Sequence, residues 1–169
     1  MTQRDRFKAV YDMHYSAIQQ YAARRTSSPE DTADVLAETF LVAWRRIGDV
    51  PQGDKALLWL YGVARRVLAN QQRGASRRAV LTERLRDELA AVRTVTPVEL
   101  DHVRKAFDEL PERDREVLAL ACWEGLSGEQ IAQVMGCTAI AARTRLHRAR
   151  RRLAALLERQ PLTMVMRKA

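Results

Sequence analysis

Residues 126–157 constrain the fold most, because they combine a short helical pattern, a tight turn and a long arginine-rich helical pattern. Ser127 is suited to cap the first helix, and the apolar residues after it follow a helical period until Gly136. Glycine adopts the left-handed backbone conformation that such a turn requires at little cost. The second helix then begins near Thr138. The stretch therefore predicts a helix-turn-helix.

The second of these helices has two unlike faces. One apolar stripe recurs every three or four positions and predicts a packed face: Ala142, Leu146, Ala149, Leu153 and Leu156. The opposite side carries Thr144, His147, Arg148 and Arg151. Six arginines and no acidic residue lie between residues 140 and 153. An arginine-rich helix is often only a solvated face, but its occurrence in a helix-turn-helix favours binding in the DNA major groove.

The composition of the whole chain agrees with a polyanionic partner. Of 169 residues, 29 are Lys or Arg and 21 are Asp or Glu, which gives a formal net charge of +8 at pH 7. No apolar run approaches the roughly 18 residues of a membrane helix, and the charged beginning of the chain is unlike a signal peptide. Cys122 and Cys137 lack metal-ligand spacing, which is typical of reduced structural thiols. We therefore expect a cytoplasmic protein without membrane insertion.

Amphipathic helices are expected throughout the first half of the chain, and no segment shows the alternation of a β-strand. The first helix covers residues 4–25 and the second about residues 28–47, with proline and acidic residues at its start. Residues 48–54 contain two glycines and a proline and predict a loop. The third helix covers about residues 55–73 and is basic.

The second half begins after a segment of different composition. Residues 76–96 are highly charged and poor in aromatic residues, so we expect a linker there that can become partly helical when docked. Two further helices precede the helix-turn-helix, and the second of them begins at Pro111. The predicted fold is all-α, with two small helical domains at residues 4–75 and 97–158 joined by the charged linker.

The sequence contains no evident catalytic or metal centre. A glycine-rich phosphate loop, a metal-ligand cluster and a nucleophile–base set are all missing, and the three histidines fall on separate expected helices. We therefore expect neither enzymatic activity nor a cofactor.

The order of these parts resembles a known family. DTADVLAETFLVAWRRI, a loop and WLYGVARRVLANQQR come first, and LPERDREVLALACWEGLSGEQIAQVMGCTAIAARTRLHRARRRL follows the linker. Together they resemble the extracytoplasmic-function (ECF) sigma factors of bacterial RNA polymerase, over about residues 7–75 and 97–157. The resemblance implies a sigma region 2-like domain followed by a sigma region 4-like helix-turn-helix domain. It also implies core RNA polymerase, promoter DNA and an anti-sigma factor as partners.

The resemblance assigns a polymerase-binding surface to the second expected helix. Asp34 and Glu38 are four residues apart and share a helical face, with Leu41 close by. In the family this surface docks on the clamp coiled coil of the largest polymerase subunit. Family members often carry Gln before the Glu, where this chain has Ala37.

The loop at residues 48–56 and the helix after it resemble the element that captures minus-10 DNA. Stacking and a pocket hold splayed bases, while cations hold the phosphates of the single strand. Trp59 and Tyr61 are two residues apart and cannot point the same way on a helix, so we expect Trp59 in the core. The expected DNA-binding residues are Tyr61, Arg65, Arg66, Asn70 and Arg73. Val50-Pro51 replaces an aromatic residue that is frequent in the family loop, so the base preference does not transfer.

The resemblance assigns minus-35 recognition to the arginine-rich helix. The expected contacts are Arg143, Thr144, Arg145, His147, Arg148 and Arg151. Arg143 and Arg148 suit base reading because a guanidinium forms bidentate hydrogen bonds with guanine, and the neighbouring arginines suit phosphates. The usual Gly-Thr of the family is Ile140-Ala141 in this chain. An apolar side chain there can contact a thymine methyl or brace the turn, and both interpretations stay open.

The sequence thus favours a sigma factor whose first domain binds polymerase and melts the minus-10 region while its second domain grips the minus-35 groove. Two rival classes stay open. A stand-alone helix-turn-helix regulator would bind duplex DNA tightly without polymerase, although the first half of the chain has no obvious ligand pocket. A helical adaptor that binds only proteins would keep its promoter activity after Arg143→Ala and Arg148→Ala.

Overall fold

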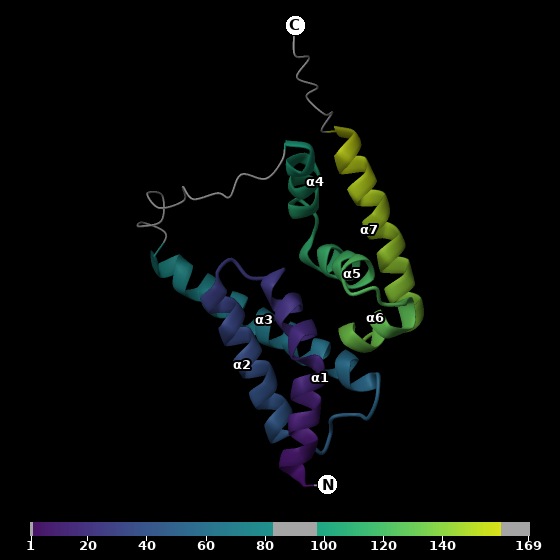
Figure 1. The fold of residues 1–169 in the computed structure, drawn as a ribbon. Helices are drawn as coiled ribbons and strands as arrows, with labels where there is room; N and C mark the ends of the chain where they lie inside the picture. The colour runs from purple at the N-terminus through teal and green to yellow at the C-terminus, as the bar shows by residue number, and fades with distance from the viewer. Residues whose placement is uncertain (1, 83–97, 160–169) are drawn as a thin grey trace, which may run out of the picture. The chain divides into compact units, whose positions relative to one another are not determined.

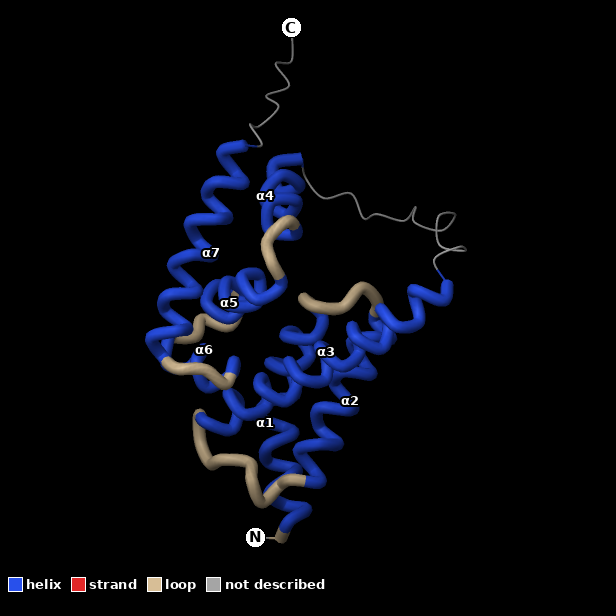
Figure 2. The backbone as a smooth tube through the Cα atoms, turned by 180° about the vertical axis from the view of Figure 1, so that it is seen from behind, coloured by secondary structure: helices blue, strands red, loops and turns tan. Residues whose placement is uncertain are grey.

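The computed structural model describes residues 2–82 and 98–159 (Figure 1). Within these ranges the chain forms seven α-helices and no strand, which confirms the predicted all-α class (Figure 2). The helices belong to two compact units, one with α1 to α3 and one with α4, α5, most of α6 and α7. Most of the predicted linker and the end of the chain lie outside the described residues. None of the described helices combines the length and hydrophobicity that a membrane span requires.

Three helices make up the first unit: α1 (Gln3–Ala23), α2 (Pro29–Arg45) and α3 (Lys55–Thr82). All three were expected, but α3 continues beyond its predicted end near Arg73, so the first part of the predicted linker is helical. The sequence predicted an earlier end because residues 74–82 show no deep apolar face. Alanine, arginine and leucine are nevertheless strong helix formers, and they extend an existing helix without such a face.

Local hydrogen bonds fix where the first two helices begin. The hydroxyl of Thr2 accepts from the backbone N–H of Asp5, whose carboxylate accepts from the N–H of Thr2, and this pair forms a capping box at α1. Ser28 caps α2 by accepting from the N–H of Asp31 at 3.0 Å, with Pro29 in the first turn. Both caps join residues three positions apart. The sequence located the start of α2, but it placed the start of α1 at residue 4 and did not identify Thr2 as its cap.

The core of the first unit lies where its three helices face one another. Ile18 and Tyr21 from α1, Val35 from α2 and Leu60 from α3 are completely shielded from solvent. The rings of Tyr21 and Tyr61 lie 5.0 Å apart between their centroids, which joins α1 to α3. Each buried side chain of this size contributes about 1.5–3 kcal/mol to folding.

A cluster of aromatic side chains lies at the interface between α1 and α2. Phe7 and Trp44 meet edge to face, with centroids 5.2 Å apart and planes at 81°. Tyr11 and Phe40 lie closer, at 4.7 Å. Phe40 is buried, whereas Tyr11 and Trp44 are 37% and 39% exposed. The cluster therefore stabilises the packing of α1 on α2 and also presents aromatic surface to solvent.

The second unit contains α4 (Val98–Asp108), α5 (Glu112–Cys122), most of α6 (Gly128–Met135) and α7 (Ala139–Arg159). Both α4 and α5 pack against α7. The predicted apolar stripe of α7 faces this packing: Ala142 and Ala149 are completely buried, and the leucines of the stripe are half-buried. Small side chains at the two alanines allow the neighbouring backbone to approach closely.

Candidate nucleic-acid and polymerase interfaces

Two helix caps and one glycine set the geometry of the helix-turn-helix that α6 and α7 form. The hydroxyl of Ser127 accepts from the N–H of Gln130 at 3.3 Å, and the amide oxygen of Gln130 accepts from the N–H of Ser127 at 2.9 Å. Gly136 ends α6 with a φ of 66°, and the hydroxyl of Thr138 caps α7 by accepting from the N–H of Ala141. The predicted helix-turn-helix is confirmed, including the role of Gly136.

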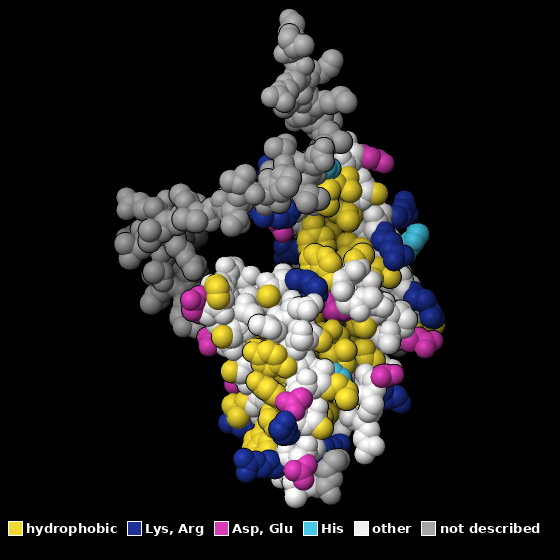
Figure 3. Space-filling model, viewed as in Figure 1, with side chains coloured by type: hydrophobic (Ala, Val, Ile, Leu, Met, Phe, Trp, Pro, Cys, Tyr) yellow, Lys and Arg dark blue, Asp and Glu magenta, His cyan; other side chains and the backbone are white. Residues whose placement is uncertain are grey.

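The outer face of α7 carries the residues predicted to contact minus-35 DNA. Exposed side chains on it are Arg143, Thr144, His147, Arg148 and Arg151, and Ile140 is 72% exposed. Arg145 is half-buried and lies toward the packed side. Figure 3 shows Lys and Arg side chains along the outer edge of this helix. The face is therefore open to a ligand and strongly basic.

Arg152 differs from the other arginines of α7. Its guanidinium donates to the carboxylate of Asp114, which lies in the first turn of α5 and is only 5% exposed. This pair joins two helices that are distant in the sequence, so the basic pattern of α7 gave no sign of it. Arg152 thus has a packing role, although its own side chain is 56% exposed.

The aliphatic stem of the Arg143 side chain, which includes Cγ and Cδ, lies over the beginning of α6. A Cβ atom at Gly128 would fall 2.8 Å from Cγ of Arg143 and 3.5 Å from its Cδ. Every residue except glycine carries a Cβ, so glycine at this position gives the arginine stem its space. The contact crosses the turn between the two helices, and sequence reasoning missed it.

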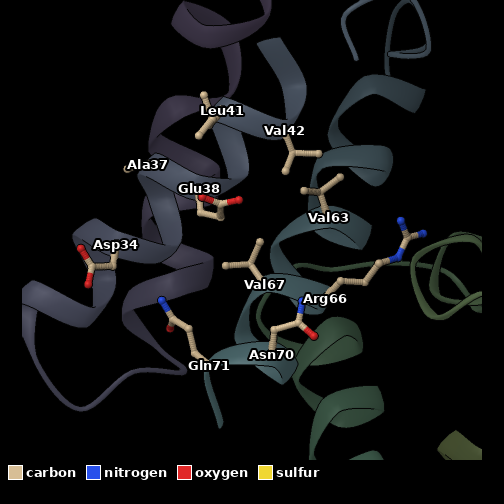
Figure 4. A pocket seen from close by; sticks show the side chains of 10 residues that line it. All are labelled: Asp34, Ala37, Glu38, Leu41, Val42, Val63, Arg66, Val67, Asn70 and Gln71. Atoms are coloured by element: carbon tan, nitrogen blue, oxygen red, sulfur yellow. The ribbon is translucent and has the colours of Figure 1, made fainter. Parts of the chain in front are cut away.

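A groove of about 600 Å³ runs between α2 and α3 in the first unit (Figure 4). The α2 side carries the three residues predicted to bind polymerase, Asp34, Glu38 and Leu41. Two residues predicted to bind minus-10 DNA, Arg66 and Asn70, lie on the α3 side. The structure therefore brings residues with two predicted functions to one groove.

The lining of this groove is apolar at its base and polar at its edges. Val42 and Val63 face each other across it, from α2 and α3 (Figure 4). Glu38 projects toward α3, whereas the guanidinium of Arg66 is directed away from α2 (Figure 4). Such a lining suits a protein helix that has apolar residues flanked by charged ones.

The two aromatic residues at the start of α3 are buried in the reverse of the predicted order. Tyr61 is only 5% exposed, while Trp59 is half-buried and packs on a small cluster of Ile47, Val50 and Ala56. The expectation that Trp59 is the core ring of the pair is therefore wrong. Both faces of α3 bear apolar residues here, and the ring of Tyr61 packs against that of Tyr21 on α1.

The other predicted minus-10 residues of α3 differ in exposure. Arg66, Asn70 and Arg73 are exposed, and Arg65 is half-buried. Arg73 donates to the amide oxygen of Asn70 at 2.6 Å, so these two side chains act as a linked pair. Three of the five predicted residues are thus open to a ligand.

The loop between α2 and α3 is anchored at its centre. Val50 is 1% exposed, and its carbonyl accepts a hydrogen bond from the guanidinium of Arg6 on α1. Arg46 pairs with Asp49 at 2.8 Å within the loop. The sequence identified Val50 as a departure from the family loop but gave no sign of its anchor, because Arg6 lies more than forty residues away.

Burial perturbs the pKa of one histidine in the first unit. His14 is 8% exposed, and burial lowers its pKa below the ordinary value of 6.5 because the imidazolium form loses hydration. Among the described residues, no group of three His, Cys, Asp or Glu side chains is placed to hold a metal ion.

Comparison with known proteins identifies both units. The family model for Sigma-70 region 2 matches residues 10–78, and that for Sigma-70 region 4 matches residues 100–153. The ECF RNA polymerase sigma factor SigL of Mycobacterium tuberculosis is 30% identical over 165 residues, which cover 92% of this chain and 91% of SigL. The chain belongs to the ECF sigma factor family. It is an alternative sigma factor that binds core RNA polymerase and directs promoter-specific transcription initiation.

Solved structures of sigma factors have the same fold as this ECF sigma factor. The sigma factor RpoE of Bartonella quintana, solved with the anti-sigma factor NepR, has a TM-score of 0.70 and 25% identity and matches 90% of this chain and 96% of RpoE. CnrH, solved with the cytosolic domain of CnrY, has a TM-score of 0.65 and 25% identity and matches 94% of this chain and 91% of CnrH. The presence of Sigma-70 regions 2 and 4 in one chain also disfavours the interpretation as a stand-alone regulator.

Proposed function

We propose that this sigma factor holds a promoter at two points, with α7 in the minus-35 major groove and α3 with its preceding loop on minus-10 single-stranded DNA. The observation that carries this proposal is that one chain has an open basic face on α7 and an open acidic face on α2. DNA favours the first face and disfavours the second. The acidic face is therefore left for polymerase.

The minus-35 contacts are assigned to the exposed outer face of α7. Arg143 and Arg148 read guanines, because the guanidinium matches the O6 and N7 acceptors in the major groove. Thr144 and His147 lie on the same side and contact neighbouring base edges or phosphates, while Arg151 holds a phosphate. Arg145 is half-buried and contributes to phosphate binding only through the end of its side chain.

The minus-10 contacts are assigned to Arg66, Asn70 and Arg73 of α3. These side chains are exposed, and the two arginines supply the cations that a displaced single strand requires. Tyr61 is left out of this surface because its ring is buried against Tyr21. The anchored loop before α3 completes the surface.

The polymerase contacts are assigned to the α2 side of the groove. Asp34 and Glu38 are exposed carboxylates, and Leu41 beside them is 38% exposed. An exposed leucine next to two acids suits a helical partner with an apolar stripe and basic edges. We assign this role to the clamp coiled coil of polymerase.

We also propose that an anti-sigma factor controls this protein. RpoE, which shares its fold, was solved with the anti-sigma factor NepR, and CnrH, which also shares it, was solved with the cytosolic domain of CnrY. The partner of this chain would cover one of the two open faces and so block polymerase or DNA. The protein would act in the cytoplasm with polymerase, and it has no catalytic chemistry of its own in this scheme.

The test is transcription with purified components. The chain, core polymerase and a library of promoter fragments should give transcripts that start at defined positions. Glu38→Lys should abolish binding to core polymerase, because it reverses a charge in the groove, whereas Glu30→Lys at an exposed position outside the groove should not. If the wild-type chain does not bind core polymerase, the proposal is wrong.

A second measurement separates the sigma factor from its rivals. The double variant Arg143→Ala and Arg148→Ala should bind core polymerase normally but lose start-site selection. Arg159→Ala, in the last turn of α7, is the matched control. Tight and specific duplex binding by the chain alone would favour the stand-alone regulator, and full promoter activity of the double variant would favour the protein-only adaptor.

A further inference from the structure

Ile140 is an apolar side chain placed where the rest of the surface is polar. It lies in the first turn of α7 and is 72% exposed. Of the two interpretations that the sequence left open, bracing the turn requires a packed side chain, and this side chain is largely unpacked. The turn is held instead by Gly136, whose φ is 66°, and by the hydroxyl of Thr138, which accepts from the N–H of Ala141.

The position of Ile140 on the helix relates it to the proposed DNA contacts. Residues three, four and seven positions apart share one face of a helix, and these spacings from Ile140 lead to Arg143, Thr144 and His147. A recognition helix enters the major groove with its N-terminal residues nearest the base edges. Ile140 is therefore at the end of α7 that lies deepest in the groove.

An isoleucine in the major groove discriminates among bases by a simple rule. Thymine is the only base that presents a methyl group there, whereas the other bases present hydrogen-bonding groups that an apolar side chain would desolvate. Burying a methyl against an apolar side chain is favourable, while leaving both in water gains nothing. The basic residues on the same face supply the charge that draws this end of the helix to DNA.

We propose that Ile140 contacts the 5-methyl group of a thymine in the minus-35 element, next to the base read by Arg143. The proposal rests on the assignment of α7 to the minus-35 element and names one base that this helix selects. Duplex DNA is the occupant of the exposed Ile140 surface.

The test removes the methyl group without changing any hydrogen-bonding group. A promoter selected by the wild-type holoenzyme is prepared with each minus-35 thymine replaced in turn by deoxyuridine. Holoenzyme affinity should fall about fourfold at one position, which is the value expected for one buried methyl group. With Ile140→Ala that loss should disappear, while the effects at the other positions stay as in the wild type.

Two controls accompany this experiment. Met13→Ala changes a side chain that is equally exposed, at 73%, but lies on α1, and it should keep the wild-type deoxyuridine profile. Thermal unfolding of Ile140→Ala should match that of the wild type, because alanine at an exposed helical site costs no packing.

Each other outcome contradicts the proposal in a recognisable way. An unchanged profile with Ile140→Ala overturns the thymine contact while leaving the proposed function intact. If Ile140→Ala binds a protein partner more weakly and keeps the wild-type deoxyuridine profile, Ile140 belongs to a protein interface. That result also overturns the thymine contact. If the wild-type holoenzyme selects no promoter at all, the proposed function fails, and the thymine contact fails with it.

Discussion

The Cγ atom of Arg143 lies 2.8 Å from the place that a Cβ atom on Gly128 would occupy. This separation is shorter than a normal carbon–carbon contact, so any side chain at position 128 must displace the arginine stem. A glycine at the start of α6 thereby determines where a proposed base-reading side chain of α7 can lie. The two helices of the helix-turn-helix are coupled through this contact.

Gly128→Ala should therefore weaken minus-35 recognition without destabilising the fold. We expect about a tenfold loss of holoenzyme affinity for its promoter, comparable to losing one bidentate contact with guanine. Stability should stay the same or rise, since alanine is a better helix former than glycine. Binding to promoter duplexes and thermal unfolding measure the two effects separately.

Two comparisons decide whether Arg143 transmits this effect. In an Arg143→Ala background the Gly128→Ala change should cost nothing further, because the displaced stem is already absent. Gly48→Ala is the matched control on a duplex that carries only the minus-35 element, since no atom lies within 4 Å of the added Cβ. Equal losses from Gly128→Ala with and without Arg143 would contradict the coupling.

Arg152→Met should destabilise the second unit by about 2 kcal/mol. It removes the cation that pairs with the buried carboxylate of Asp114, and a buried charge without a partner is costly. Arg151→Met, one position earlier on the exposed face, should change stability by less than about 0.5 kcal/mol. Denaturant unfolding of both variants checks this difference, and equal stabilities would show that the pair contributes nothing.

The stability of the first unit should decrease as the pH falls below about 6.5. Burial lowers the pKa of His14 in the folded protein, so the unfolded chain binds more protons in this range. The contribution of neutral His14 is therefore complete above its unfolded pKa and is lost progressively as the pH falls toward its folded pKa. Denaturant unfolding between about pH 5.5 and 8 measures the slope.

Substitution of the histidine isolates this effect. His14→Gln should flatten the pH dependence because the variant has no group at position 14 that titrates in this range. His147→Gln, at an exposed position on α7, should leave the slope unchanged. A slope that persists in His14→Gln would assign the pH dependence to other groups.

Arg6→Met should impair promoter opening several-fold while core polymerase binding stays normal. The guanidinium of Arg6 holds the carbonyl of Val50, so its loss frees the centre of the loop that precedes α3. Permanganate reactivity of unpaired thymines in the minus-10 region measures opening directly. Arg4→Met, on the exposed side of α1, is the control, and an equal loss from both variants would exclude a specific role for the loop anchor.

The sequence was sufficient for features that depend on neighbours a few residues apart. Ser28, Ser127 and Thr138 were located as helix starts because a cap acts on an N–H group two or three residues away. Gly136 was located as a helix end because its left-handed conformation is a local property. The exposed basic face of α7 followed from a period of 3.6 residues, and the family resemblance came from the order of the sequence motifs.

Tertiary structure alone decided between residues that look alike in the sequence. Tyr61 is buried more deeply than Trp59 because Tyr21 of α1 receives its ring, and Arg152 differs from Arg151 because Asp114 lies opposite it. The contact of the Arg143 side chain with Gly128 and the exposure of Ile140 were likewise decided by tertiary structure. Helical periods and caps arise from bonds within one helix, so the sequence of that helix is enough to predict them. These four features depend instead on whether a distant segment of the chain packs against the residue.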